Sequence, residues 1–143
     1  MTESPQLGLL NSLVERIGVS SVQNKNTSSY GKQFLLDGLN ETCWNSDAGD
    51  RQWVSLSFSQ PVLISKLEIR FQGGFSGKDN STFVILNEEL KLPIHPVDAN
   101  TIQSFELPEV EIATEKVKIV FSGSTDFYGR IVIYNLNLYG KTK

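Results

Sequence analysis

The sequence has very little cysteine, histidine or uninterrupted apolar chain. Its single cysteine, Cys43, excludes an internal disulfide and a cysteine-rich zinc site, and it fits a reducing compartment. Its single histidine, His95, stands in the segment P-I-H-P, which favours a rigid loop over a catalytic pair. No apolar run approaches the roughly 18 residues that a membrane span needs, so none is expected.

Positive charge is also scarce. Thirteen lysines and arginines stand against 16 acidic residues, which gives a net charge of -3 at pH 7. No stretch gathers enough lysine and arginine to neutralise a phosphate backbone, so direct nucleic-acid binding is not expected. The first residues lack the positively charged start of a secretory signal. We therefore expect an intracellular protein, located in the nucleus, the cytoplasm or both.

Motifs of enzymes are missing as well. The sequence contains no G-x-S-x-G, Walker loop, H-E-x-x-H or dinucleotide fingerprint. Pairs of acidic residues such as Glu88 and Glu89 are ordinary solvated charges. The 143 residues suit one domain with a single hydrophobic core. These absences predict a non-enzymatic protein.

The N-terminal segment, residues 1–19, has a different pattern from the rest of the chain. Its apolar residues recur at helical spacing, with a proline near the start and Gly18 near the end. This pattern predicts a short helix, or an apolar arm packed on a domain of residues 20–143. The apolar positions are Leu7, Leu10, Val14 and Ile17.

From Trp53 onward the apolar residues alternate with polar ones, which is typical of half-buried strands. Clusters of turn-forming residues occupy 72–81, 92–100 and 122–129. This spacing predicts an all-β fold, an antiparallel jelly-roll β-sandwich of about eight strands. The expected strands are 53–58, 62–72 (separated from the first by Gln60 and Pro61), 82–86, 102–107, 116–122 and 130–139.

The stretch F-L-L-D-G-L-N-E-T-C-W-N-S-D, residues 34–47, has two interpretations. Asp37, Asn40 and Thr42 supply the oxygen types that calcium prefers, and Gly38 permits a tight turn. Asp-Gly is equally an ordinary turn signal, and the amide and hydroxyl groups can bond the backbone instead. The residues alone leave both a cation loop and a simple turn open, with Trp44 behind it as a core residue.

A second informative loop is S-T-D-F-Y-G-R, residues 124–130. Its neighbouring aromatics, Phe127 and Tyr128, are costly to expose unless they recognise a partner or are covered by other loops. Asp126 and Arg130 flank them. An ion pair between these two residues that only holds the loop is the simpler interpretation.

Four segments together resemble the discoidin family, also called coagulation factor 5/8 type C, within the galactose-binding-domain-like jelly rolls. They are the 34–47 stretch, Q-W-V-S-L-S-F, V-L-I-S-K-L-E-I-R-F-Q followed by G-G-F, and the closing G-R-I-V-I-Y-N-L-N-L-Y-G. The resemblance covers roughly residues 20–140. It implies the jelly-roll fold and a binding function.

The resemblance also implies a structural calcium ion beneath the loop that contains Asp37, Asn40 and Thr42. An acidic residue near the start of the final strand completes the family's site, and here that position is Asn135. An amide brings a neutral oxygen in place of a charged one, which weakens calcium affinity.

Many extracellular members of the family bind sugars or anionic lipid through loops at one end of the sandwich. The corresponding loops here are 24–32, 45–53, 72–80 and 124–130. They supply the aromatic rings and polar groups that a sugar or peptide site needs. The candidate ligand- or partner-binding residues are Tyr30, Asn45, Asp47, Arg51, Phe75, Asp126, Phe127, Tyr128 and Arg130.

A narrower resemblance is to small intracellular discoidin-like proteins that associate with a nuclear receptor. It is carried by S-S-V-Q-N-K-N-T, E-T-C-W-N-S-D, F-Q-G-G-F and T-D-F-Y-G-R-I-V-I-Y. It implies a stand-alone module in the nucleus that binds the receptor and represses its transcriptional activity. The alternative is a carbohydrate-binding module that uses the same end loops.

Overall fold

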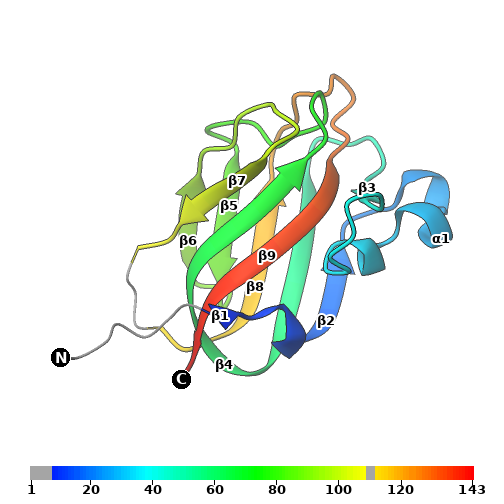
Figure 1. The fold of residues 1–143 in the computed structure, drawn as a ribbon. Coiled ribbons are helices and arrows are strands. Elements are labelled where there is room, and N and C mark those ends of the chain that lie inside the picture. The colour runs from blue at the N-terminus through cyan, green and yellow to red at the C-terminus, as the bar shows by residue number, and fades with distance from the viewer. Residues whose placement is uncertain (1–7, 109–111) are drawn as a thin grey trace.

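Two antiparallel layers of strands face each other in the structure, a computed structural model that describes residues 8–108 and 112–143 (Figure 1). Four short helical turns are also described: η1 (Asn11–Leu13), η2 (Gln23–Lys25), α1 (Thr27–Tyr30) and η3 (Lys32–Phe34). The nine strands within these residues are β1 (Gly8–Leu9), β2 (Val14–Val19), β3 (Trp44–Asn45), β4 (Gln52–Phe71), β5 (Thr82–Leu86), β6 (Leu90–Ile94), β7 (Ile102–Glu106), β8 (Thr114–Phe121) and β9 (Val132–Thr142).

The long strand β4 belongs to both layers. Its first half pairs with β2 and β8, and β8 continues through β5 to β6. Its second half pairs with β9 and β7, and β9 also carries the short strands β1 and β3. Figure 1 shows β4 curving at the lower end of the molecule between its two halves. The predicted jelly-roll β-sandwich is therefore confirmed.

The core lies between the two layers and is almost entirely aliphatic and aromatic. The rings of Phe71 on β4 and Phe121 on β8 meet edge to face across it, with centroids 5.9 Å apart. Trp44 is fully buried, as the sequence predicted, and its indole nitrogen donates to the carbonyl of Ser21 at 2.9 Å. That bond satisfies the one polar group that this side chain takes into the core.

The N-terminal segment, predicted as a short helix or an apolar arm packed on the domain, packs on the domain with one short helical turn, η1, and is otherwise extended where it is described. Residues 14–19 form strand β2 on the edge of β4. A β-bulge between Val14 and Arg16 adds one residue, so the inward side chains fall at Val14, Ile17 and Val19. A spacing of three in a bulged strand imitates a helical turn. Leu7 lies outside the described residues.

Two other expectations about strands need correction. The segment that contains Gln60 and Pro61 does not end a strand, because β4 runs through it with a shift in register between Ser57 and Val62. Residues 90–94, assigned partly to a turn, form the edge strand β6, in which Pro93 is tolerated because an edge strand need not donate from every backbone nitrogen. No helix in the described residues is long and apolar enough to cross a membrane.

Candidate functional site

Loops from distant parts of the chain meet at the end of the sandwich where β4 begins and ends. The loops after β4 and β8 bond each other through Ser76 and Thr125, whose backbone and hydroxyl groups form hydrogen bonds of 2.9 and 3.1 Å. Asp98, from the loop after β6, accepts from the backbone nitrogen of Gly74 at 2.7 Å. These bonds fix the loops relative to one another. We call residues 72–80, 95–101 and 122–131 the end loops.

Asp126 and Arg130 hold the loop between β8 and β9 closed. The Asp126 carboxylate accepts hydrogen bonds from the backbone nitrogen and Nε of Arg130, both at 3.0 Å, and from its Nη2 at 3.3 Å. The hydrogen bond to the Arg130 side chain lowers the pKa of Asp126 below its ordinary value. The predicted ion pair is therefore present, and it supports the loop from inside.

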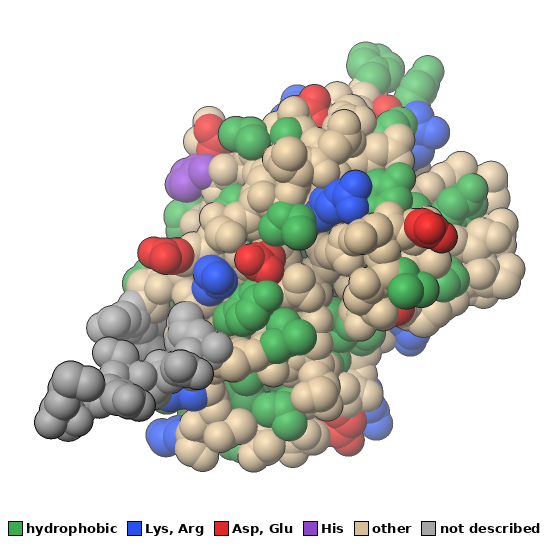
Figure 2. All heavy atoms as spheres, viewed as in Figure 1, with side chains coloured by type: hydrophobic (Ala, Val, Ile, Leu, Met, Phe, Trp, Pro, Cys, Tyr) green, Lys and Arg blue, Asp and Glu red, His purple; other side chains and the backbone are tan. Residues whose placement is uncertain are grey.

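Phe127 and Tyr128 project from this closed loop, and we call them the aromatic tip. Phe127 is 93% exposed and Tyr128 is 63% exposed. Their rings pack edge to face with centroids 5.2 Å apart, so each limits the motion of the other. Figure 2 shows apolar side chains protruding at the top of the molecule, over the end loops. The sequence left open whether other loops cover these rings, and the structure leaves both rings accessible.

Arg130 connects the aromatic tip to the loop after β4. Its guanidinium lies 5.2 Å from the ring centre of Phe75 and 5.6 Å from that of Tyr128. Arg130 is thereby held by one carboxylate and two rings. Four of the nine candidate binding residues are in one cluster: Phe75, Asp126, Tyr128 and Arg130. Phe127 joins it through its contact with Tyr128.

Gly49 and Gly129 allow the loop before β4 to reach this cluster. The nitrogen of Gly49 donates to the carbonyl of Tyr128 at 2.9 Å. Gly129 has φ 85°, and a Cβ atom there would overlap the carbonyl oxygen of Gly49. Only glycine combines that backbone angle with so close an approach. The aromatic tip is consequently braced from two sides.

The other candidate binding residues do not join the cluster. Asn45 donates to Gln23 Oε1 at 3.0 Å, and Asp47 accepts from the backbone nitrogen of Asn24 at 3.0 Å, so both tie the chain to the segment after β2. Tyr30 lies in α1, and Arg51 is an exposed residue just before β4. No hydrogen bond or ion pair within the described residues joins these four side chains to the aromatic tip.

The four candidate calcium ligands lie in two pairs. Asp37 accepts from the hydroxyl of Thr42 and from the backbone nitrogen of Leu39. Asn135, which is 8% exposed, donates from its side-chain nitrogen to Asn40 Oδ1 at 3.4 Å. The loop and the final strand therefore do meet at the expected residues. Within the described residues no three His, Cys, Asp or Glu side chains gather, and this set offers one carboxylate.

Asp98 and Thr125 were not among the predicted site residues. Thr125 lies within the loop that the sequence singled out, and its hydroxyl lies 3.3 Å from Asp98 Oδ1. Asp98 sits in a cluster of turn residues, a pattern that indicates a loop but not which other loop it contacts. Loop-to-loop contacts of this kind carry no periodic signal.

Solved structures confirm the fold. A family 32 carbohydrate-binding module from C. perfringens, in complex with galactose, superposes with a TM-score of 0.72 at 17% identity, covering 94% of this chain and 99% of that one. An F5/8 type C domain from Bacteroides fragilis gives 0.69 at 14% identity over 98% and 100% of the two chains. A fucolectin from Morone saxatilis serum gives 0.74 at 15% identity, over 94% and 48%.

Relatives of similar length share far more sequence. No model of a known protein family matches the chain. Nuclear receptor 2C2-associated protein of Danio rerio is 45% identical over 132 residues, which cover 86% of this chain and 89% of that protein. The proteins of the same name from Bos taurus and Homo sapiens are 45% and 42% identical, over 87% and 86% of this chain and 90% and 89% of theirs. The chain therefore belongs to the nuclear receptor 2C2-associated protein family, built on a discoidin-like jelly roll.

Proposed function

We propose that this chain is a non-enzymatic protein-interaction module that binds a nuclear receptor in the nucleus and represses its transcriptional activity. The family name supports the class of partner. The observation that carries the proposal is the aromatic tip, two large rings exposed on a loop that is braced from several sides. Exposed apolar groups on a rigid loop are typical of a recognition surface.

The bracing matters for affinity as well as for shape. Binding by a mobile loop costs conformational entropy when the loop becomes ordered. The three hydrogen bonds between Asp126 and Arg130 and the contact of Gly49 with Tyr128 hold the loop in place before any partner arrives. Phe127 and Tyr128 are therefore the residues whose loss should weaken binding most.

The test is capture of purified nuclear receptor 2C2 by the immobilised chain. Phe127→Ala combined with Tyr128→Ala should weaken capture at least roughly tenfold, the loss expected when a binding hot spot is truncated. Leu39→Ala is the matched control, because Leu39 is an exposed apolar residue in the 37–42 loop, outside the end loops. Unchanged capture by a double variant that melts like the parent would contradict this site.

A carbohydrate-binding module that uses the same loops is the second candidate. It is favoured by the solved structure of similar fold that contains galactose, and by the aromatic rings beside Arg130 in the end loops. A glycan array would give a signal lost in the Phe127→Ala, Tyr128→Ala variant if this function holds. If the chain captures the receptor but gives no glycan signal at millimolar ligand, the carbohydrate-binding function is contradicted.

For the 37–42 loop we propose a low-affinity calcium site formed by Asp37, Asn40, Thr42 and Asn135. Its support is that the residues pair by hydrogen bonds, Asp37 with Thr42 and Asn40 with Asn135, and its single carboxylate sets a low affinity. Calcium affinity falls with the number of charged ligands, so binding at around millimolar calcium is the expectation. The site would stabilise the loop and take no part in recognition.

A further inference from the structure

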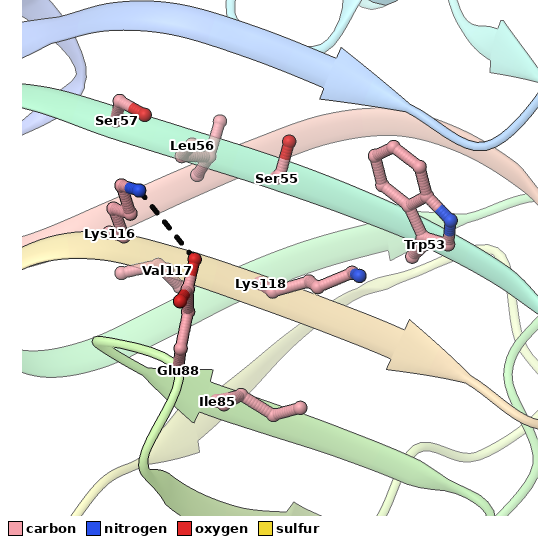
Figure 3. Close-up of a pocket in the computed structure, with 9 residues that line it drawn as sticks. All are labelled: Trp53, Ser55, Leu56, Ser57, Ile85, Glu88, Lys116, Val117 and Lys118. Carbon is pink, nitrogen blue, oxygen red and sulfur yellow. Dashed lines mark ion pairs between the residues drawn. The ribbon is translucent and has the colours of Figure 1, made fainter.

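A groove of about 400 Å³ lies on the outer face of the layer that contains β4, β8 and β5 (Figure 3). Trp53, Ser55 and Ser57 of β4 point outward into it, because alternate residues of this strand, Val54 and Leu56, point into the core. None of the residues that line it belongs to the end loops. The groove is thus separate from the aromatic tip.

The small side chains of Ser55 and Ser57 form part of the floor of this groove. Beside the groove, Gly18 on β2 lies opposite Ser55, and a Cβ atom at Gly18 would stand 2.6 Å from the Ser55 hydroxyl. Long side chains rise around these small residues, with Trp53 at one end and Lys116 with Glu88 at the other (Figure 3). A flat sheet surface becomes concave in this way.

The groove is positively charged on a protein whose net charge is negative. Lys116 and Lys118 of β8 line it, and among the described residues Glu88 is the one carboxylate that does so. The strand register adds two further cations on the same outer face: Arg16 lies opposite Ser57, and Lys91 lies opposite Ile85. Because cations outnumber carboxylates among these described residues, an anionic ligand is favoured.

The two lysines of the groove differ in the contacts that an anionic ligand would have to replace. The ammonium of Lys118 lies 4.7 Å from the centre of the Trp53 ring, and it makes no ion pair within the described residues. Lys116 pairs with Glu88 at 3.5 Å, but both side chains are more than half exposed. Exposed pairs of this kind contribute at most about 1 kcal/mol, so an incoming carboxylate can replace Glu88.

We propose that this groove binds an acidic segment of a protein partner in an extended conformation. Lys116 and Lys118 are two residues apart on β8, so their side chains leave the same face of the strand about 7 Å apart. An extended peptide places the side chains of alternate residues at that same spacing. Carboxylates at every second position would meet both lysines, and the apolar residues between them face away from the cations.

The indole of Trp53 on β4 and the side chain of Ile85 on β5 flank β8 on its two sides and add apolar surface to the groove. This surface distinguishes a peptide from a simple counterion, because it can cover the methylene groups of glutamate side chains whose carboxylates meet the lysines. The groove is therefore a second surface, on the face of the β4–β8–β5 layer that points away from the core. Binding there does not depend on the proposed receptor contact at the aromatic tip.

The experiment is a fluorescence titration of the full chain with the blocked peptide acetyl-Glu-Val-Glu-Val-Glu-amide. Trp44 is fully buried and Trp53 lines the groove, so a change in emission reports on the groove. We expect a saturable change that weakens as ionic strength rises from about 0.05 to about 0.5 M, because salt screens exposed charges. The same peptide with glutamine in place of glutamate should give no change.

Two double variants make the test specific. Lys116→Gln with Lys118→Gln should weaken peptide binding roughly tenfold or more, since both charge contacts are lost. Lys141→Gln with Lys143→Gln is the matched control, because these exposed lysines are also two residues apart but lie at the end of the chain. Its affinity should stay within about twofold of the parent. Melting curves establish that each variant remains folded.

Three outcomes would overturn the proposal. They are no saturable signal at millimolar peptide, equal weakening in both double variants, and equal binding of the glutamine peptide. A single-stranded DNA of matched charge provides the remaining comparison. If that DNA binds more tightly than the peptide and with the same dependence on Lys116 and Lys118, the groove is a polyanion site and the peptide assignment is wrong.

Discussion

Asp126 shows how one carboxylate can carry a pH dependence. Its pKa is lowered from an ordinary value of 3.8, chiefly by the hydrogen bond to the Arg130 side chain and then by the backbone nitrogen and charge of Arg130. A lowered pKa in the folded state means that the ionised form stabilises the fold. This contribution is complete above pH 3.8, the ordinary pKa, and is lost as the pH falls through the lowered value.

The variant Asp126→Asn should therefore melt at a lower temperature than the parent at pH 7. The difference in melting temperature between parent and variant should narrow as the pH is lowered below about 4, because the parent loses the same interaction by protonation. Thermal melts followed by circular dichroism from about pH 7 to about pH 3 measure it. Asp50→Asn, at an exposed residue of the loop before β4, is the control and should melt close to the parent at pH 7. A gap that stays constant for Asp126→Asn would contradict the role of the ion pair.

Asn135 decides how strongly the 37–42 loop can hold calcium. In Asn135→Asp, a carboxylate replaces the amide that donates to Asn40, at a position only 8% exposed. Without calcium this substitution should lower the free energy of unfolding by roughly 1–3 kcal/mol, because a buried carboxylate cannot donate the hydrogen bond that the amide makes. With calcium the cost should be offset, since the ion gains a charged ligand.

The measurement is the rise in melting temperature when calcium is added. An ion that binds only the folded chain raises the melting temperature, and tighter binding raises it more. We expect a larger shift for Asn135→Asp than for the parent, and little shift when Asp37→Asn is added to either protein. Equal shifts in the parent and in Asn135→Asp would show that residue 135 does not contact the ion.

Residues that act through local sequence were the easier ones to predict. Asp126 and Arg130 are four apart in one loop, and their pairing follows from that spacing. Trp44 was recognisable as core. The contact of Lys118 with Trp53 was not predicted, because it depends on the register of β8 against β4. The alternation at Trp53, Ser55 and Ser57 was visible, yet it indicated only a solvent-facing side.

At the level of elements, the pairing of β1 with β9 offers a matched comparison of two glycines. Gly140 on β9 is buried, and a Cβ atom there would overlap the carbonyl oxygen of Leu63. Gly8 lies directly opposite on β1, and its Cβ would stand at an ordinary 3.9 Å from the nearest atom. The two positions therefore differ in available space while sharing one strand pair.

Gly140→Ala should lower the free energy of unfolding by about 3 kcal/mol, the upper range for overpacking against backbone. Gly8→Ala should change it by less than about 0.5 kcal/mol, as expected of an unstrained surface substitution. Denaturant unfolding of both variants gives the comparison. A loss of similar size in the two proteins would mean that the approach of β4 to β9 is not what requires glycine.

Regular strands were predicted well, whereas irregular ones were not. The expected strand 82–86 coincides with β5, and the strands expected at 102–107, 116–122 and 130–139 correspond to β7, β8 and β9 with ends shifted by at most three residues. The bulge in β2 produced a false helical spacing, and the bend of β4 placed turn residues inside a strand. Periodicity fails where the register shifts, since the pattern then no longer has a fixed repeat.

For the whole molecule, the N-terminal strand β2 is a structural part of the sandwich. Its Val14, Ile17 and Val19 pack against the core, and the strand covers one edge of β4. Deleting residues 1–19 removes these side chains and the buried Leu10 and uncovers the edge of β4. The cost is roughly 5 kcal/mol if Leu10 contributes about 2 kcal/mol and each partly buried side chain about 1 kcal/mol. That is comparable to the entire stability of a small domain.

The deletion should therefore yield a chain that lacks a cooperative melt and elutes as aggregates. Deleting residues 1–7 removes no residue of a described strand and is the control, which should melt as one transition. Circular dichroism and size-exclusion chromatography distinguish the two. A folded, monomeric protein after removal of residues 1–19 would show instead that the segment is a detachable arm.

The candidate site as a whole was predicted better as a set of loops than as a set of contacts. The family resemblance indicated which end of the sandwich to inspect, and the cluster of Phe75, Asp126, Tyr128 and Arg130 formed there. Tyr30 and Arg51 lie in the predicted loops but do not join the cluster. Which loop residues contact one another depends on side-chain packing in three dimensions, and the order of residues in the sequence does not predict it.

The strand that curves between the two layers also determines how the molecule exchanges its amide hydrogens with solvent. β4 is bonded to β2 and β8 along one half and to β9 and β7 along the other, so the strand as a whole is released only when both layers open. The most protected amides of β4 should therefore exchange only through global unfolding, with a protection set by its free energy. Residues of the first half of β4 line the groove, and one of the end loops follows the second half. A ligand bound at either surface stabilises the folded state, so it should slow the exchange of the same amides.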